Sequence, residues 1–434
     1  MPDGFDVVVV GAGPAGAAAA LVLARAGRAV CLVERGPFPG SKNMYGGVVY
    51  GRYLDTLIPD WWERVPVQRW VTRRETRMMT GTQALTVGYS TDAWGRPPYN
   101  GMTCFRPDFD RWFADQAVAA GAVLLTSTVA TGLLRDAAGR VAGVRTDRPD
   151  GDLPARLVIA CDGVNSFLAK EAGMYPDSGP EHFTLGAKEV LALPREEIDR
   201  RFNVTGTDGV DIEAVGVTQG IPGGGFVYTN LDSVAIGVVL QLPGLAKSGK
   251  RPEDLIAGFK RHPSIAPLIQ GAELKEYSAH LIPEGGYDAM PRLAGDGMLV
   301  AGDAAALCLA AGIWLEGVNF AMASGAAAGT TAHEALASGD VTRTGLAAYR
   351  KRLERNFVLR DHKKLRRAPG LILGDRMQTR YPAMVCDLAE GMFTVGNPAP
   401  KPGLTRLLRR SAKSNGIRLR DLAKDGWNGL RSFG

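Results

Sequence analysis

The chain has 434 residues, which exceeds the size of a single ordinary hydrophobic core, so two or three structural units are expected. Its five cysteines stand far apart without a CxxC pair, which argues against a disulfide framework, a zinc site and a cysteine-ligated iron–sulfur cluster, and favours a reducing cytoplasm. The net charge of +6 is not accompanied by interleaved aromatic residues, so nucleic acid is not expected as a partner.

The first apolar run is not preceded by a basic region, so it indicates a strand and not a signal peptide. Residues 6–10 predict a buried parallel strand, and an alanine-rich helix is expected over residues 14–26. The glycines between them permit a tight turn, a close approach of backbone to a pyrophosphate, and packing of the helix on the strand. The candidate cofactor contacts here are Gly11, Gly13, Ala15 and Gly16.

A second strand is predicted over residues 29–33, and it ends in Glu34 and Arg35. A carboxylate about 20 residues after the glycines suits a ribose hydroxyl. The next segment, residues 40–47, is too rich in glycine for the interior of a helix or strand. It is either backbone that approaches an isoalloxazine ring or a plain surface loop, and its candidate contacts are Lys42, Asn43, Gly46 and Gly47.

Arg106 precedes a predicted helix over residues 107–120. A guanidinium in this place could complement a pyrophosphate with two parallel hydrogen bonds, and the alternative is an ordinary surface arginine. A strand is expected near residues 123–128, and the candidate contact Val129 follows it.

Two further predicted strands, residues 157–160 and 297–301, each lead into a glycine and an aspartate. The first pair could reach a cofactor or only cap the next helix. The carboxylate of the second pair could accept hydrogen bonds from ribityl hydroxyls. The pairs are Asp162 with Gly163 and Gly302 with Asp303.

A helix rich in small residues is predicted over residues 320–337. Its N-terminus would face the pyrimidine ring of a flavin, where backbone N–H groups and the helix dipole stabilise negative charge on the reduced ring. The alternative is a closely packed helix without a cofactor role. The candidate contacts before it are Gly317, Val318 and Asn319.

These segments lie hundreds of residues apart, yet each suits a different part of one long dinucleotide. A nicotinamide cofactor needs only the first, whereas a permanently bound flavin is held along its length, so the predicted cofactor is FAD. Because a flavin carries the redox chemistry itself, no catalytic side chain is predicted. The histidines show no metal-ligand spacing, and no metal site is predicted.

The cofactor segments alternate with other material, so the cofactor domain must be discontinuous. We predict an α/β fold with a Rossmann-like FAD-binding domain of the glutathione-reductase/p-hydroxybenzoate-hydroxylase type, an inserted antiparallel-sheet domain and a basic helical C-terminal region. The predicted ranges are 1–72, 101–186 and 285–345 for the FAD domain, 73–100 and 187–284 for the inserted domain, and 346–434 for the C-terminal region.

The C-terminal region, residues 346–434, contains 20 Lys and Arg against 7 Asp and Glu, whereas the preceding part contains 31 against 38. Helical spacing continues over residues 346–367. A basic segment of this kind could meet an acidic protein or an anionic membrane surface, or form only a solvated helical face. Residues 301–323 are interrupted by Asp303 and Glu316 and make a poor transmembrane helix, so a cytoplasmic protein peripheral to the inner face of the cell membrane is expected.

Several longer segments carry a family resemblance. They are residues 40–47 (Gly-Ser-Lys-Asn-Met-Tyr-Gly-Gly), 161–170 (Cys-Asp-Gly-Val-Asn-Ser-Phe-Leu-Ala-Lys), 186–190 (Gly-Ala-Lys-Glu-Val), 223–230 (Gly-Gly-Gly-Phe-Val-Tyr-Thr-Asn), 277–287 (Tyr-Ser-Ala-His-Leu-Ile-Pro-Glu-Gly-Gly-Tyr) and 301–305 (Ala-Gly-Asp-Ala-Ala). With them, nearly the whole chain resembles the FixC-type flavoproteins, close relatives of electron-transfer-flavoprotein:quinone oxidoreductase.

The resemblance implies an FAD-dependent oxidoreductase that takes electrons originating in electron-transfer flavoprotein and passes them to a membrane quinone. Longer relatives carry an iron–sulfur domain at the C-terminus, for which this chain lacks the cysteines. FixC-type proteins resemble it in this respect and use a separate small ferredoxin-like subunit, which is therefore the implied partner. The implied quinone contacts are Gly224, Gly225, Tyr228, Tyr277, Gly285, Gly286 and Trp314.

One departure from the family pattern is that Trp314 and Glu316 stand in the flavin-facing loop, where smaller or basic residues are expected. They could alter quinone access or the flavin potential. Three other functions remain open: reduction of isoprenoid double bonds, because geranylgeranyl reductases resemble FixC proteins; NAD(P)H-dependent aromatic hydroxylation, which uses a segment like that at Asp162; and a noncatalytic FAD-containing assembly subunit.

Overall fold

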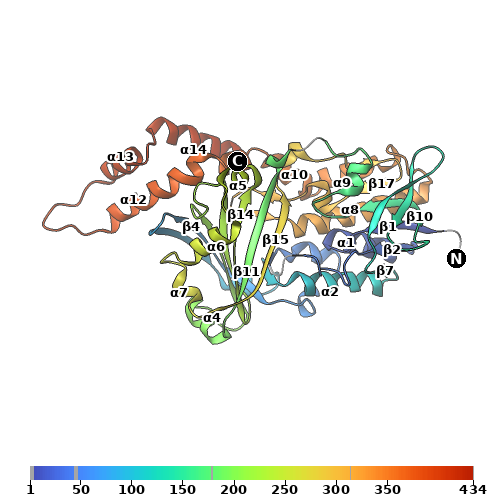
Figure 1. Cartoon of the computed structure of the whole chain (residues 1–434), viewed down its shortest axis with the longest axis horizontal. Helices are drawn as coiled ribbons and strands as arrows, with labels where there is room; N and C mark the ends of the chain where they lie inside the picture. The colour runs from blue at the N-terminus through green and yellow to red at the C-terminus, as the bar shows by residue number, and fades with distance from the viewer. Residues whose placement is uncertain (1–3, 44–46, 177–178, 313, 434) are drawn as a thin grey trace.

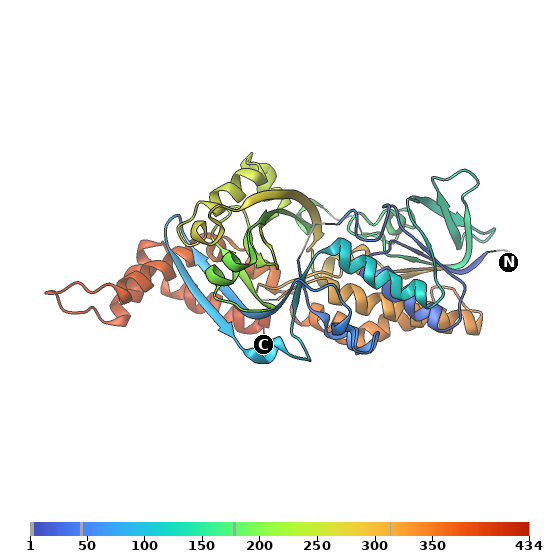
Figure 2. The ribbon, with the colours of Figure 1, turned by 90° about the horizontal axis from the view of Figure 1, so that it is seen from below.

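Two β-sheets lie one after the other along the long axis of the molecule, and the C-terminal helices extend beyond the second sheet (Figure 1). The computed structural model describes residues 4–43, 47–176, 179–312 and 314–433. The N-terminus lies at the far end of the first sheet, at the opposite end of the molecule from the hairpin formed by α12 and α13 (Figures 1 and 2).

Eight of the described strands form the first sheet, and its centre is parallel in the order β17-β10-β1-β2-β7. The central strands β1 and β2 are runs of Val, Leu and Cys that are buried on both faces, as a parallel strand covered by helices must be. The antiparallel strands β16, β8 and β9 complete it. The bounds are β1 (Phe5–Val10), β2 (Val30–Val33), β7 (Val123–Leu125), β8 (Ala130–Arg135), β9 (Val141–Thr146), β10 (Leu153–Ala160), β16 (Ala294–Gly295) and β17 (Met298–Val300).

Helices α1 (Pro14–Arg25) and α8 (Val318–Ser338) pack against each other beside this sheet. Their contact is close enough to require glycine. A Cβ atom on Gly325 of α8 would lie only 1.9 Å from the carbonyl oxygen of Ala15 in α1. The two helix backbones therefore touch directly near their N-terminal halves. Helix α2 (Arg106–Ala119) packs on α1.

Nine of the described strands form the second sheet, in the order β15-β11-β14-β13-β12-β4-β6-β3 with β5 paired to β4. All of its pairs are antiparallel except β4 with β12, which is parallel. The alternation of apolar and polar residues that indicates a strand does not reveal the direction of its neighbours, so the parallel pairing of β4 with β12 could not be predicted. The bounds are β3 (Gly47–Val49), β4 (Arg69–Met79), β5 (Ala84–Ser90), β6 (Met102–Cys104), β11 (Phe183–Ala192), β12 (Asp208–Val215), β13 (Gly223–Thr229), β14 (Ser233–Gln241) and β15 (Glu273–Pro283).

The predicted α/β fold class is confirmed by these two sheets. The predicted domain ranges remain a prediction, but β3, β6 and the first residues of β4 fall inside ranges expected for the FAD domain and are hydrogen-bonded into the second sheet. Segments from the ranges predicted for the FAD domain therefore form part of the second sheet, and the chain alternates between the two units more often than the predicted ranges imply.

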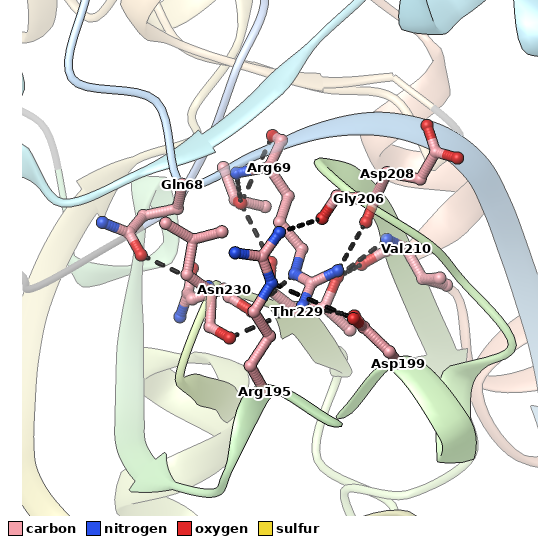
Figure 3. A network of polar contacts seen from close by, with 11 residues as sticks. Gln68, Arg69, Arg195, Asp199, Gly206, Asp208, Val210, Thr229 and Asn230 are labelled. Atoms are coloured by element: carbon pink, nitrogen blue, oxygen red, sulfur yellow. Dashed lines mark hydrogen bonds and ion pairs between the residues drawn. The ribbon is translucent and has the colours of Figure 1, made fainter. Parts of the chain in front are cut away.

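A buried arginine secures the start of β4 to the rest of the second sheet (Figure 3). The Arg69 side chain is fully buried, and its Nε donates to the carbonyl oxygen of Asn230 at 2.7 Å, while Nη1 donates to the carbonyl oxygen of Asp208 at 2.9 Å. Its Nη2 is paired with the Asp199 carboxylate at 2.7 Å. A buried charge is tolerated only when it is hydrogen-bonded and paired, and here these bonds tie β4 to the ends of β12 and β13.

The C-terminal region is helical, as predicted. Helices α9 and α10 pack on α8 beside the first sheet, and later helices lie beside the second sheet, where α12 contacts β4 and β5 (Figure 2). The described residues contain no helix that is both long enough and apolar enough to span a membrane. Its elements are α9 (Ala348–Arg355), α10 (Phe357–Lys364), α11 (Ala368–Ile372), a π-helical turn (Arg376–Arg380), α12 (Tyr381–Phe393), α13 (Leu404–Ser414) and α14 (Leu419–Phe433), and the remaining α-helices are α3 (Phe167–Glu171), α4 (Arg195–Phe202), α5 (Leu242–Ser248), α6 (Pro252–Lys260) and α7 (Ala266–Ile269).

Replacing Gly325 with Ala is expected to lower the free energy of unfolding by about 1–3 kcal/mol, because the added methyl group pushes α8 away from α1. The measurement is the urea midpoint at an unchanged slope. Gly426→Ala in α14 is the matched control, since a Cβ atom there meets no heavy atom within 4 Å. That substitution should leave stability unchanged or raise it by up to about 1 kcal/mol. Equal losses from both substitutions would contradict the prediction.

Candidate functional site

A cavity of about 790 Å³ lies between the two sheets, at the carboxyl ends of the parallel strands of the first sheet. The residues that follow β1, β2, β10 and β17 line one side of it, and the face of the second sheet lines the other. In open parallel sheets this edge is where ligands bind, because strand ends and helix N-termini meet there. Three predicted segments, separated by hundreds of residues, therefore come together in one cavity.

The three glycines of the turn after β1 differ in their surroundings. Gly11 has a φ of +98°, and a Cβ atom on it would lie 2.2 Å from the carbonyl oxygen of Cys161. Gly16 does not line the cavity, because it allows α1 to pack, and a Cβ atom there would lie 1.8 Å from the oxygen of Gly11. Gly13 lines the cavity and has no heavy atom within 4 Å of a built Cβ, so its backbone is open to a ligand.

Glu34 lies at the end of β2 with its carboxylate buried against this turn. Its Oε2 accepts a hydrogen bond from the N–H of Ala12 at 3.1 Å, and its Oε1 accepts from the N–H of Gly36 at 2.7 Å. Burial raises the pKa of Glu34, while the two backbone bonds favour the charged form. Each carboxylate oxygen has a second lone pair, so the group still has acceptors for ligand hydroxyls.

Three cations, Arg35, Lys42 and Arg106, line the same half of the cavity. Arg106 is fixed by Asp110 one helical turn later, through Nε–Oδ1 and Nη2–Oδ2 bonds of 2.7 and 2.8 Å. Asp110 also accepts a bond of 2.6 Å from the Asn43 side chain. Asp110 was not among the predicted residues, although its i, i+4 spacing from Arg106 on a predicted helix indicates that the two side chains can pair.

Both predicted aspartates line the cavity. The Oδ2 atom of Asp162 caps α3 by accepting from the N–H of Leu168 at 3.1 Å, and its Oδ1 is buried without a hydrogen-bond partner among the described residues. Burial raises the pKa of Asp162 and of Asp303, and Arg106 opposes the rise at Asp303. Gly302 does not line the cavity, because at a φ of +67° it packs against Ala15.

The N-terminus of α8 also faces the cavity, with Gly317 and Val318 in its lining. Asn319 does not line it, because its side-chain amide instead donates to the Glu316 carboxylate. Trp314 lies in the cavity wall, with its ring centroid 6.0 Å from that of Phe433 in α14.

Several strands of the second sheet contribute residues to the cavity. Of the predicted quinone contacts, Gly224, Gly225 and Tyr228 line it, whereas three do not. Tyr277 lies nearer the start of β15 than the stretch of that strand that lines the cavity, which begins at His280. Gly285 packs against Ala289 and His182, and Gly286 forms a turn at a φ of +72°.

Most of the remaining predicted residues line the cavity, namely Ala15, Asn43, Gly47, Val129 and Gly163, whereas Gly46 lies outside the described residues. Two groups of lining residues were not predicted from the sequence, and the strand pattern of the second sheet could have indicated only the first. The first group is Thr76, Met78, Lys188, Glu213, His280 and Glu284 from the second sheet, and the second is Ile372, Leu373, Met377 and Phe433 from the C-terminal region.

These residues fit FAD. A phosphate-binding turn with an open backbone at Gly13, a cluster of three cations, and a carboxylate at the end of β2 occupy one half of the cavity. The unpartnered Oδ1 of Asp162 is an acceptor in the wall that a hydroxyl-bearing ligand can satisfy. One wall of the other half consists of apolar side chains, which suits a ring system.

Comparison with known proteins agrees with this assignment. The family described as "FAD dependent oxidoreductase" matches residues 6–211, and the "ETF-QO/FixC family C-terminal domain" matches residues 368–434. The first confirms FAD as the cofactor and the chain as an oxidoreductase.

Two relatives match along most of the chain. "Probable electron transfer flavoprotein-quinone oxidoreductase YdiS" of Escherichia coli K12 is 40% identical over 432 residues, 99% of each chain. "Protein FixC" of Bradyrhizobium diazoefficiens is 42% identical over 399 residues, 91% of each chain. Among solved structures, a geranylgeranyl bacteriochlorophyll reductase-like protein from Thermoplasma acidophilum is similar in fold, with a TM-score of 0.72 and 19% identity over 98% of this chain and 99% of that one.

The resemblance to FixC proteins thus extends over almost the full length of the chain, with about two residues in five identical. The chain belongs to the ETF-QO/FixC family of FAD-dependent oxidoreductases.

Proposed function

We propose that this chain passes electrons from an electron-transfer flavoprotein to a membrane quinone, together with a separate ferredoxin-like iron–sulfur subunit. The observation that carries the proposal is the extent of the cavity. Among the described residues it is one continuous cavity, which begins at the segments suited to FAD and continues along the glycine-rich strand β13 to apolar residues of the C-terminal region. We expect a second planar ring to bind beside the flavin half. The name of the Escherichia coli relative, an electron transfer flavoprotein-quinone oxidoreductase, agrees with this chemistry.

In this proposal the flavin half of the cavity holds FAD by charge and backbone. Arg106, fixed by Asp110, and the backbone at Gly13 would meet the pyrophosphate, while Glu34 would hold a ribose hydroxyl. Asp303 would accept from the ribityl chain. Bound FAD supplies the electron storage, and the N-terminus of α8 would stabilise the negative charge of its reduced form.

The second half of the cavity would hold the quinone ring. Gly224 leaves space on the side of β13 that Tyr228 also occupies, whereas a Cβ atom on Gly225 would point to the other face, 2.9 Å from the Phe259 ring. The π-helical turn of the C-terminal region is joined to this strand, because the Gln378 side chain accepts a hydrogen bond from the N–H of Gly223 at 3.0 Å. The apolar wall of this half is formed by Trp314, Leu315, Ile372, Leu373, Met377 and Phe433.

The α12–α13 hairpin is the part of the surface that we propose contacts an anionic membrane. Met392, Phe393 and Val395 are 55%, 79% and 66% exposed at its tip, and exposed apolar residues that cluster in this way mark an interaction surface. Basic side chains flank them on the loop and on α13. An apolar tip with a basic rim suits an anionic bilayer. The basic residues are Lys401, Arg406, Arg409 and Arg410.

The electron path is tested with the purified protein and its co-purifying partners. We expect that reduced electron-transfer flavoprotein bleaches the flavin absorbance, that added quinone restores it, and that NADPH does neither. We also expect iron to co-purify with the complex although this chain lacks the cysteine spacing for a cluster. Direct reduction of the flavin by NADPH, without reduction by the flavoprotein, would contradict the proposal.

Asp303→Ala is expected to weaken FAD binding by about tenfold to a hundredfold, the loss expected for hydrogen bonds to a charged acceptor. The measurement is the dissociation constant of FAD from reconstituted apoprotein, followed by flavin fluorescence. Asp254→Ala is the control, because that carboxylate is 62% exposed on α6, outside the cavity. Unchanged affinity in Asp303→Ala would remove Asp303 from the binding site.

Phe393→Glu is expected to reduce binding of the protein to vesicles that contain phosphatidylglycerol, because it places a charge at the apolar tip of the hairpin. Co-sedimentation with vesicles measures the bound fraction. Leu274→Glu, at a residue that is 56% exposed on β15, carries the same change of charge outside the hairpin. The proposed surface is wrong if the two variants lose binding equally.

A further inference from the structure

Two carboxylates and one guanidinium form a buried cluster on the cavity-facing side of the second sheet. Arg74 on β4 donates from Nε to Asp211 Oδ2 at 3.0 Å and from Nη2 to Glu213 Oε1 at 2.7 Å. The Asp211 and Glu213 side chains are only 3% and 13% exposed. Both belong to β12 two residues apart, so they share one face, and Arg74 stands directly opposite Asp211 in the parallel β4–β12 pair.

An ion pair with Arg74 needs one carboxylate, whereas the cluster contains two, those of Asp211 and Glu213. With both carboxylates ionised it carries a net charge of −1 in a largely buried place, which is costly. Burial raises the pKa of Glu213, and the negative charge of Asp211 raises it further, although Arg74 acts in the opposite direction. A proton bound to the cluster removes the excess charge.

In the part of the chain that the structure describes, the groups that face the cluster from neighbouring elements are two phenols and a further carboxyl. Tyr228 of β13 is the register partner of Asp211, and the guanidinium carbon of Arg74 lies 5.7 Å from the centre of the Tyr50 ring. Burial raises the pKa of both phenols, so they are neutral at physiological pH. Glu316 of β19 (Leu315–Glu316) adds a further carboxyl, whose pKa burial also raises.

Of the three charged groups in the cluster, Glu213 lines the cavity. Its strand partner on β13 is Phe226, and the next pair along is Ala214 with Gly225, so Glu213 adjoins the glycine strand at which the quinone is proposed to lie. Lys188 and His280 also line the cavity and titrate, but the charges that act on them include Arg106, in the flavin half.

We propose that Glu213 is the proton donor in the reduction of the quinone, and that Arg74 holds the carboxylate that remains. This inference rests on the proposed function. Conversion of a quinone to a quinol takes two electrons and two protons, and the electrons are those delivered from the electron-transfer flavoprotein. The O–H bond of the Glu213 carboxyl breaks, an O–H bond forms on a quinone oxygen, and the carboxylate keeps its hydrogen bond from Arg74. Solvent supplies the second proton and later reprotonates Glu213.

The test compares Glu213→Gln with the wild type in the complete electron-transfer complex. Glutamine retains the shape of the side chain and cannot donate a proton from a carboxyl. Reduction of the flavin by electron-transfer flavoprotein should be unchanged, while the rate of quinone reduction should fall by roughly a hundredfold.

The pH profile separates proton donation from a merely structural role. A donor works only when protonated, so wild-type quinone reduction should be fast at low pH and slow down as the pH rises through the Glu213 pKa, which lies above the usual glutamate range. Glu213→Gln should lose this dependence, and Glu213→Asp, which retains a carboxyl, should keep it. In infrared difference spectra, the band of a protonated carboxyl should be present in the wild type and absent from Glu213→Gln.

Glu75→Gln is the matched control. Glu75 lies on β4 next to Arg74, is 13% exposed, and is paired with Arg77 at 2.8 Å, but it points to the opposite face of the sheet. It should leave quinone reduction unchanged. A Glu213→Gln variant with wild-type rates at every pH, or one that loses FAD and flavin reduction as well, would overturn the inference. A wild-type complex that reduces no quinone would instead overturn the proposed function.

Discussion

The direct contact between the backbones of α1 and α8 is the constraint on which the cavity depends. Gly325 allows α8 to lie against Ala15, and both residues are within about three turns of the helix N-termini. Because α1 begins at the turn after β1 and α8 begins directly after Gly317, this contact brings two helix N-termini to the same edge of the first sheet. The N-terminus of α1 suits a phosphate, and that of α8 suits a flavin ring that becomes negative on reduction. In the proposed arrangement, a single packing contact would therefore set the distance between the sites for these two parts of FAD.

The second constraint is that the chain passes several times between the two sheets. Strands β3, β4 and β6 leave the region of the first sheet and form one side of the second, and Arg69 secures β4 there with bonds to backbone carbonyl oxygens and an ion pair. A second sheet attached by a single linker could move relative to the first. Here Val49, Trp70 and Met102 of these strands belong to the same buried cluster as Val10 and Ala12 at the glycine turn, which favours a preformed site over one assembled on binding.

The residues predicted to bind the cofactor could be proposed from the sequence because they follow strands at fixed offsets. Gly11, Glu34, Asp162 and Asp303 each stand one or two residues after a predicted strand, and the parallel strands bring these positions to one cavity. Glu213 could not be found in this way, because it is an isolated carboxyl within a strand and its role depends on Arg74, distant in sequence. The apolar wall from the C-terminal region was missed for the same reason: Phe433 meets Trp314 only in the folded chain.

The two halves of the cavity differ in charge, and this difference has a consequence for electron transfer. In the flavin half, the cations Arg35, Lys42 and Arg106 stand beside the carboxyl groups of Glu34, Asp162 and Asp303, whereas in the half proposed for the quinone Asp211 and Glu213 share the guanidinium of Arg74. Adding electrons to a group beside those carboxyls costs Coulomb energy that rises steeply in a desolvated place. A proton that enters with the electrons cancels that cost. An acceptor that takes up protons on reduction, as a quinone does, is therefore favoured in this half over an acceptor that takes up electrons alone.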